Sequence, residues 1–150
     1  MKVIFASDHR GFDLKGKLIP FVQSLGHQTE DAGPFSYNPS DDYPDFISLA
    51  AKKISMDPTN FLGILIGGSG QGEAMVANRF PRVRAAVYYG GKDRILTLSR
   101  EHNDANALSL GARCLSEEDA KHSIEVWLSA KFTGEERHVR RIAQIDTLTK

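Results

Sequence analysis

The apolar positions along the chain fall into two alternating patterns. Continuous apolar runs predict buried strands at residues 3–6, 61–66, 84–89 and 107–110, and residues 27–33 are expected to contain a short second strand. Apolar residues at helical spacing, or helix-forming composition, predict helices at residues 14–25, 44–55, 71–78, 92–103, from 116 onward and at 134–148. Continuous rather than alternating apolar strands are typical of a sheet covered on both faces. The order β-α-β-α-β-α-β-α-β-α-α therefore predicts an α/β fold with a parallel sheet.

Three local features refine this prediction. Pro20 lies within the first helical stripe, where it predicts a kink or a late helix start. Ser116, followed by Asp119 three residues later, resembles a capping box and predicts a helix start. The last helix is expected to turn its apolar residues inward, namely Val139, Ile142 and Ala143, and its arginines outward.

Composition narrows the class of protein. The 150 residues fit one domain, and a formal net charge of zero disfavours proteins that bind nucleic acid or anionic membranes. The apolar run near the start, Val3 to Ala6, is too short for a signal peptide, and no run approaches the roughly 18 apolar residues of a membrane span. With Cys114 as the only cysteine, we expect a cytoplasmic protein without an internal disulfide.

In open parallel sheets, ligands bind beyond the carboxyl ends of the strands. That rule selects residues 7–11, residues 67–73 and the stretch after Tyr88. Residues 67–72 hold four glycines in six positions. The loop lacks the Lys-Ser/Thr of a P-loop, and it has neither the spacing nor the position of the dinucleotide fingerprint. Its amides suit a phosphate or a developing oxyanion, and the alternative is a tight strand-to-helix turn.

Two acidic residues have two interpretations each. Glu73 is either a surface carboxylate near the positive end of a helix or a general base beside an anion-stabilising loop. Asp8 either faces the crevice or caps the following helix. A phospho-acceptor receiver domain would need an aspartate where the third strand ends, and this chain has Gly67 and Gly68 there.

The polar residues near the carboxyl terminus are also ambiguous. His102 ends a helix, where it can act chemically or simply complement the helix dipole. Arg137 and Arg141 share a helix face and suit a phosphate dianion, or they form a solvated face paired with neighbouring glutamates. No two histidines show metal-ligand spacing, so we expect no metal site.

Taken together, six motifs resemble those of the type B ribose-5-phosphate isomerases, a family that includes galactose-6-phosphate isomerases. They are "SDHRGFDLK", "DYPDF", "GGSGQGEAMVANRF", "RAAV", "SREHNDANALSLGAR" and "RHVRRI", and the resemblance runs from residue 3 to about 145. It implies a three-layer Rossmann-like fold with a five-stranded parallel sheet. It also implies a homodimer or tetramer whose active sites lie at the subunit interface, with the helix at about 134–148 packed on a partner. The reaction implied is aldose–ketose isomerisation of a sugar phosphate through a cis-enediol, without cofactor or metal, as in the pentose phosphate pathway.

The resemblance also implies roles for individual residues. Relatives of one subgroup carry a cysteine base where this chain has Gly67, whereas Glu73 matches the base of the other subgroup. The ring-opening acid/base is expected to be His102, with His138 as the rival. Ser69 and the adjoining amides are expected to stabilise the enediolate. The other substrate-binding residues implied are Asp8, His9, Gly68, Gly70, Gln71, Gly72, Asn103, Arg113, Arg137 and Arg141.

Two alternatives stay open at this stage. The same chemistry could act on another sugar phosphate, such as a tetrose phosphate, allose 6-phosphate or galactose 6-phosphate. A non-catalytic nucleotide-binding module would use Glu30 and Asp31 to bind a ribose, but the first strand-to-helix turn lacks the glycines that this requires.

Overall fold

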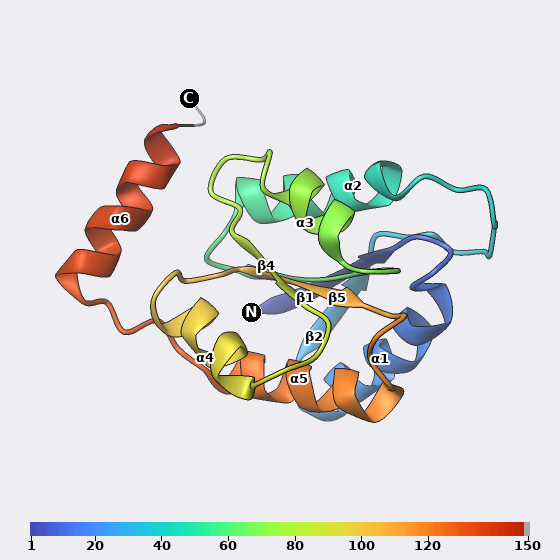
Figure 1. Cartoon of the computed structure of the whole chain (residues 1–150). Helices are drawn as coiled ribbons and strands as arrows, with labels where there is room; N and C mark the ends of the chain where they lie inside the picture. Colours follow the sequence, from blue (N-terminus) through green and yellow to red (C-terminus); the bar gives the residue numbers. More distant parts are fainter. Residues whose placement is uncertain (149–150) are drawn as a thin grey trace.

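Five parallel strands form the centre of the molecule (Figure 1). The computed structural model describes residues 1–148. The strands are β1 (Lys2–Ser7), β2 (Gln28–Asp31), β3 (Phe61–Gly67), β4 (Ala85–Tyr88) and β5 (Ala107–Gly111), in the spatial order β2-β1-β3-β5-β4. Each strand coincides with a run predicted from the sequence, so the prediction of a five-stranded parallel sheet is confirmed.

Helices cover both faces of the sheet, which gives the expected three layers (Figure 1). One face carries α2 (Tyr43–Met56) and α3 (Gln71–Ala77), and the other carries α1 (Phe12–Ser24), α4 (Asp93–Glu101) and α5 (Glu117–Ser129). The last helix is α6 (Glu136–Thr147). Within residues 1–148, no helix is both long enough and apolar enough to cross a bilayer.

Successive side chains along each strand point to opposite faces of the sheet, and helices cover both faces. The apolar runs in the strands are therefore continuous rather than alternating. Phe5 of β1 faces the α1/α5 layer together with Ile64 of β3, whereas Ile4 and Leu65 face the layer of α2 and α3. All four are fully buried. Because burial stabilises each such side chain by about 1.5–3 kcal/mol, both faces of the sheet must be apolar.

The strand order places a topological switch point between β1 and β3. From β1 the chain passes to β2 on one side and then to β3 on the other. The loops that leave the carboxyl ends of β1 and β3 therefore diverge and open a crevice between them. The loop after β1 begins at Asp8, and the loop after β3 contains the glycines and leads to Glu73.

The structure settles two of the local predictions. Pro20 lies inside α1, which begins at Phe12, so a helix start at Pro20 is wrong. The capping box at α5 is confirmed, because Ser116 accepts from the backbone N–H of Asp119 and the Asp119 carboxylate accepts from that of Ser116.

The orientation predicted for the last helix is wrong for the single chain. α6 stands apart from both helical layers (Figure 1). Val139 is 49% exposed and Ala143 is exposed, while Ile142 is only partly buried. His138, rather than an apolar residue, is the buried side chain of α6. Helical periodicity identifies an apolar stripe but does not say which chain covers it.

Candidate active site

A polar cavity of about 380 Å³ opens at the switch point, at the carboxyl end of the sheet. Seven of the residues selected from the sequence contribute to its lining, and they come from the loops after β1, β3 and β5 and from the first turn of α3. These residues are Asp8, His9, Gly68, Ser69, Gly72, Glu73 and Arg113. Gly70 is buried and Gln71 is exposed in the same loop. A cavity of this size can hold a small phosphorylated sugar.

Glu73 lies in the first turn of α3 and is only 3% exposed, so it is not a surface carboxylate. Burial raises the pKa of its carboxyl group, its own backbone N–H opposes that rise, and the negative charge of Asp8 adds to it. A carboxyl group with a raised pKa is a stronger base than an ordinary glutamate, and this one lines a cavity.

Gly67 provides the space that the Glu73 carboxylate occupies. A Cβ atom at position 67 would collide with both carboxylate oxygens. Positions 67 and 73 therefore share one volume, and a side chain at position 67 excludes the present position of Glu73. This gives a physical reason why the resemblance implies a base at position 67 in one subgroup of the family and at position 73 in the other.

A hydrogen bond from β5 holds the glycine loop in place. Gly70 has φ 77°, a left-handed conformation that favours glycine, and it precedes the first residue of α3. The hydroxyl of Ser109, which is fully buried, donates to the Gly70 carbonyl at 2.6 Å. Ser69 Oγ accepts from the backbone N–H of Gln71 at 3.2 Å. These contacts fix a loop whose backbone groups border the cavity.

The structure places Asp8 in the cavity lining and does not make it the cap of α1. Its Oδ1 accepts from the backbone N–H groups of Arg10 and Gly11 in the loop, while the N-cap residue of α1 is Gly11, which has no side-chain cap bond within the described residues. His9 is held by Asp41, whose Oδ1 accepts from the His9 backbone at 3.0 Å and lies 2.7 Å from His9 Nδ1. Asp8, His9 and Asp41 each bring a potential metal-ligand atom to within 4.8 Å of the others. One ligand atom of each residue takes part in the hydrogen bonds just described, whereas the buried Asp41 Oδ2 has no hydrogen-bond partner among the described residues.

The remaining predicted residues gather elsewhere, around the end of α4 and the start of α6. The rings of His102 and His138 stack, with centroids 4.3 Å apart and planes 16° apart. His102 is half-buried, whereas His138 is 4% exposed and its buried Nε2 has no hydrogen-bond partner among the described residues. Burial lowers the pKa of His138, and the positive charges of His102 and Arg137 lower it further.

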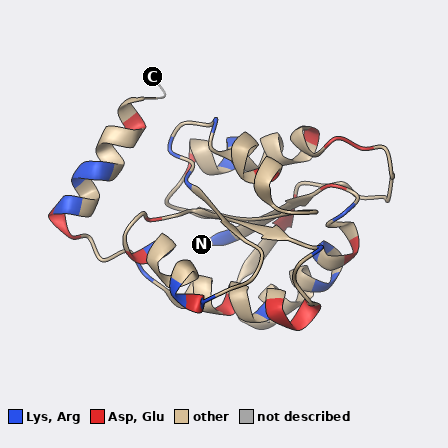
Figure 2. Cartoon of the chain, in the orientation of Figure 1, with Lys and Arg blue, Asp and Glu red and all other residues tan. Residues whose placement is uncertain are grey.

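Basic side chains continue along α6, and Figure 2 shows them gathered on its first turns. Arg137 and Arg141 are both exposed, and Arg137 Nε pairs with Glu135 at 2.9 Å. Asn103 is also exposed and borders a separate cavity of about 360 Å³ near β4 and α6. These cations therefore lie at a different place from Glu73.

Strand direction explains this separation. The chain enters β5 from Asn103 and leaves it toward Arg113, so these two residues lie at opposite ends of one strand. Five residues at about 3.3 Å each span roughly 16 Å. His102 therefore lies at the amino end of the sheet and Glu73 at the carboxyl end. Within one chain the predicted residues form two clusters.

One place selected from the sequence does not join the cavity around Glu73. The stretch after Tyr88 lines a separate cavity of about 230 Å³ with Asp93 and His122. Sequence reasoning also missed three supporting residues: Asp41 behind His9, Tyr43 in the lining, and Ser109 under the glycine loop. Tyr43 lies within the motif "DYPDF" and Ser109 within "SREHNDANALSLGAR", so only Asp41 lies outside the quoted motifs.

Comparison with known proteins places these features in a family. Residues 3–145 match the family model described as Ribose/Galactose Isomerase. Ribose-5-phosphate isomerase B of Mycolicibacterium paratuberculosis is 39% identical over 142 residues, which cover 95% of this chain and 87% of the relative. That of Escherichia coli K12 is 35% identical, covering 98% and 95%. The crystal structure of ribose-5-phosphate isomerase B from Mycoplasma genitalium with bound ribulose-5-phosphate has a TM-score of 0.92 and 35% identity, covering 98% and 95%.

Proposed function

The chain belongs to the ribose/galactose isomerase family, and we propose that it interconverts ribose 5-phosphate and ribulose 5-phosphate. The observation that carries this proposal is the buried Glu73 carboxylate in a polar cavity at the switch point. The relative with bound ribulose-5-phosphate has nearly the same fold and supports the choice of substrate.

In this proposal Glu73 removes the proton from C2 of the open-chain aldose and returns it to C1. The electrons of the broken C–H bond form the C1–C2 double bond of the cis-enediolate, while the C1 carbonyl oxygen takes up negative charge. The proton of the C2 hydroxyl then passes to O1, so that the C2 carbonyl forms as Glu73 returns its proton to C1. Ser69 and the amides of Gly70, Gln71 and Gly72 stabilise that charge, because donors aimed at a developing oxyanion lower the barrier. Asp8 binds sugar hydroxyls. No step in this sequence needs a metal or cofactor.

The second cluster supplies ring opening and phosphate binding from a partner subunit. His102 is the better candidate for the ring-opening acid/base, because its imidazole is half-exposed whereas that of His138 is buried. Arg137 and Arg141 of one copy join His9 and Arg113 of the other around the phosphate, and Asn103 contacts the substrate beside His102. The proposed assembly is a homodimer, or a tetramer of such dimers, in the cytoplasm, with the exposed side of α6 packed on the partner.

The choice of sugar is tested by comparing kcat/KM for ribose 5-phosphate, allose 6-phosphate, galactose 6-phosphate and a tetrose phosphate. We expect ribose 5-phosphate to give the highest value. A higher value for another sugar would keep the chemistry and change the substrate. No turnover of any sugar, with micromolar binding of NAD, FMN or ATP by calorimetry, would instead support a nucleotide-binding module.

A further inference from the structure

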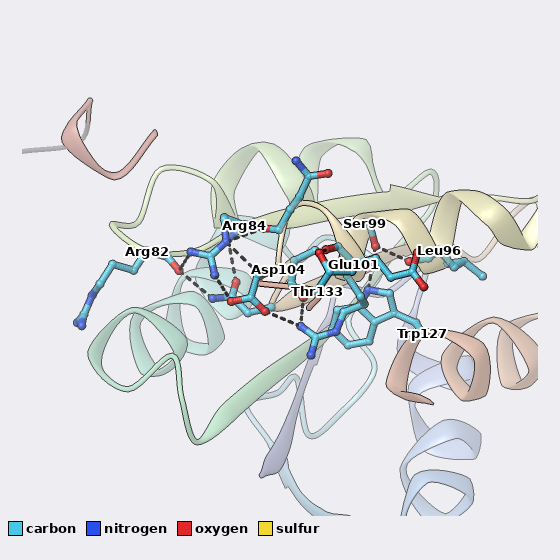
Figure 3. A network of polar contacts seen from close by, with 12 residues as sticks. Arg82, Arg84, Leu96, Ser99, Glu101, Asp104, Trp127 and Thr133 are labelled. Carbon is cyan, nitrogen blue, oxygen red and sulfur yellow. Dashed lines mark hydrogen bonds and ion pairs between the residues drawn. The ribbon is translucent and has the colours of Figure 1, made fainter. Parts of the chain in front are cut away.

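Three charged side chains meet at the turn that leads from α4 into β5, and two of them, Asp104 and Arg84, are labelled in Figure 3. Asp104 lies in the turn, Arg100 belongs to α4, and Arg84 immediately precedes β4. Asp104 Oδ2 accepts from Arg84 at 3.0 Å, and Asp104 Oδ1 accepts from Arg100 at 3.4 Å. We call these three residues the Asp104 clamp.

The clamp joins charged side chains to one another and also holds the backbone of the turn. Arg84 Nε donates to the carbonyl of Asn103 at 2.9 Å and to that of Asp104 at 3.0 Å. The side chains of Arg84 and Arg100 are only 13% and 8% exposed, and the Arg100 guanidinium lies over the ring of Trp127. Asp104 has φ 44°, a left-handed conformation that most side chains avoid, so its contacts hold an unfavourable backbone.

A second set of contacts fixes the helix end just before the turn. Both the backbone N–H and the hydroxyl of Thr133 donate to the Glu101 carbonyl, at 3.1 and 3.0 Å. The His102 N–H donates to Leu98 within α4. His102 and Asn103 therefore lie between two anchored points, and the bonds to Asn103 named here reach its backbone. Its side-chain amide is exposed.

We propose that the Asp104 clamp positions His102 and Asn103 for the active site of the partner subunit. This inference rests on the proposed function, because it assigns the clamp to the half of the site that one copy lends to the other. Arg84, Arg100 and Asp104 are positioning residues. They fix the backbone from which the side chains of His102 and Asn103 project. Within residues 1–148, the clamp forms no hydrogen bonds with those two side chains, which would meet the substrate.

The first test compares two substitutions of Asp104. Glycine accepts positive φ without strain, so Asp104→Gly removes the carboxylate while permitting the turn. Asparagine also tolerates positive φ and keeps one acceptor. We expect Asp104→Gly to lower kcat about tenfold, because small misplacements of reacting groups are costly, and Asp104→Asn to recover most of that loss.

The decisive test places the same substitution in different halves of a mixed dimer. A heterodimer of Glu73→Gln and His102→Gln chains keeps one intact site, formed by His102 of the first chain and Glu73 of the second. Asp104→Gly added to the Glu73→Gln chain alters the clamp of that intact site. Added to the His102→Gln chain, it alters only the inactive site. Both heterodimers carry the same substitutions, so a general loss of stability affects them alike.

We expect kcat to fall about tenfold in the first placement and to stay unchanged in the second. Equal activity in the two placements, with the parent heterodimer active, would overturn the clamp and leave the proposed function intact. An inactive parent heterodimer would overturn the two-chain site itself, and with it the clamp.

Discussion

The two ends of the sheet gather different polar groups. At the carboxyl end, a cavity contains a buried carboxylate and the backbone of a glycine loop. At the amino end, a half-exposed His102 and the exposed arginines of α6 border no part of that cavity. The first half has the buried Glu73 carboxylate and few cations, whereas the second has the His102 imidazole and the arginines of α6. Because strand β5 separates the two halves, our proposal is that two copies of the chain complete each site.

The largest effect is expected when the Glu73 carboxylate at the carboxyl end of the sheet is removed. Glu73→Gln keeps the shape of the side chain but removes the base, so we expect kcat to fall by about 10²–10⁴. Substrate binding should change little, because the phosphate is held by other residues. Steady-state kinetics with ribose 5-phosphate measures both. Glu125→Gln, an exposed carboxylate on α5, is the control, and wild-type turnover in the Glu73 variant would refute the assignment of the base.

Gly67→Ala tests whether positions 67 and 73 share one volume. The added methyl group must displace the Glu73 carboxylate, and we expect a loss of about 10² in kcat/KM. The same change made in the Glu73→Gln background should have little further effect, because the base is already absent. Independent, additive losses in the double variant would contradict the shared volume.

At the amino end, the arginines should affect binding more than turnover. Arg141→Met is expected to raise KM about tenfold while kcat changes less, because a charge-assisted bond to phosphate contributes about 1.5–3 kcal/mol. Arg140→Met removes an equally exposed charge from the same helix and provides the control. Equal effects of the two substitutions would mean that α6 contributes only general charge.

The smallest expected effect concerns stability. Burial raises the pKa of Glu73, so the folded state holds this proton more tightly than the unfolded state. Stability therefore falls as pH rises from the ordinary glutamate pKa, about 4.3, through the raised pKa of the folded state. Glu73→Gln removes this cost, and thermal unfolding should show a higher Tm than wild type at pH 8, with a smaller difference at pH 4. A lower Tm at pH 8 would contradict the destabilising burial of the carboxylate.

Sequence reasoning predicted the sheet because strands buried on both faces must be apolar throughout. It also brought Asp8 and Glu73 together, since the carboxyl ends of parallel strands share one edge. It did not reveal that the missing side chain of Gly67 accommodates Glu73, or that Asp41 holds His9 from 32 positions away. Such contacts depend on tertiary geometry and leave no local pattern. Likewise, the apolar stripe of α6 does not reveal that Val139 and Ala143 stay exposed in the single chain.

The central claim is that two copies of the chain complete each site. Its most direct test mixes Glu73→Gln and His102→Gln chains carrying different affinity tags and purifies the heterodimer. Either homodimer should be nearly inactive, whereas the heterodimer should recover about half of the wild-type kcat per dimer, because one of two symmetric sites is intact. A heterodimer as inactive as its parent homodimers would contradict the claim.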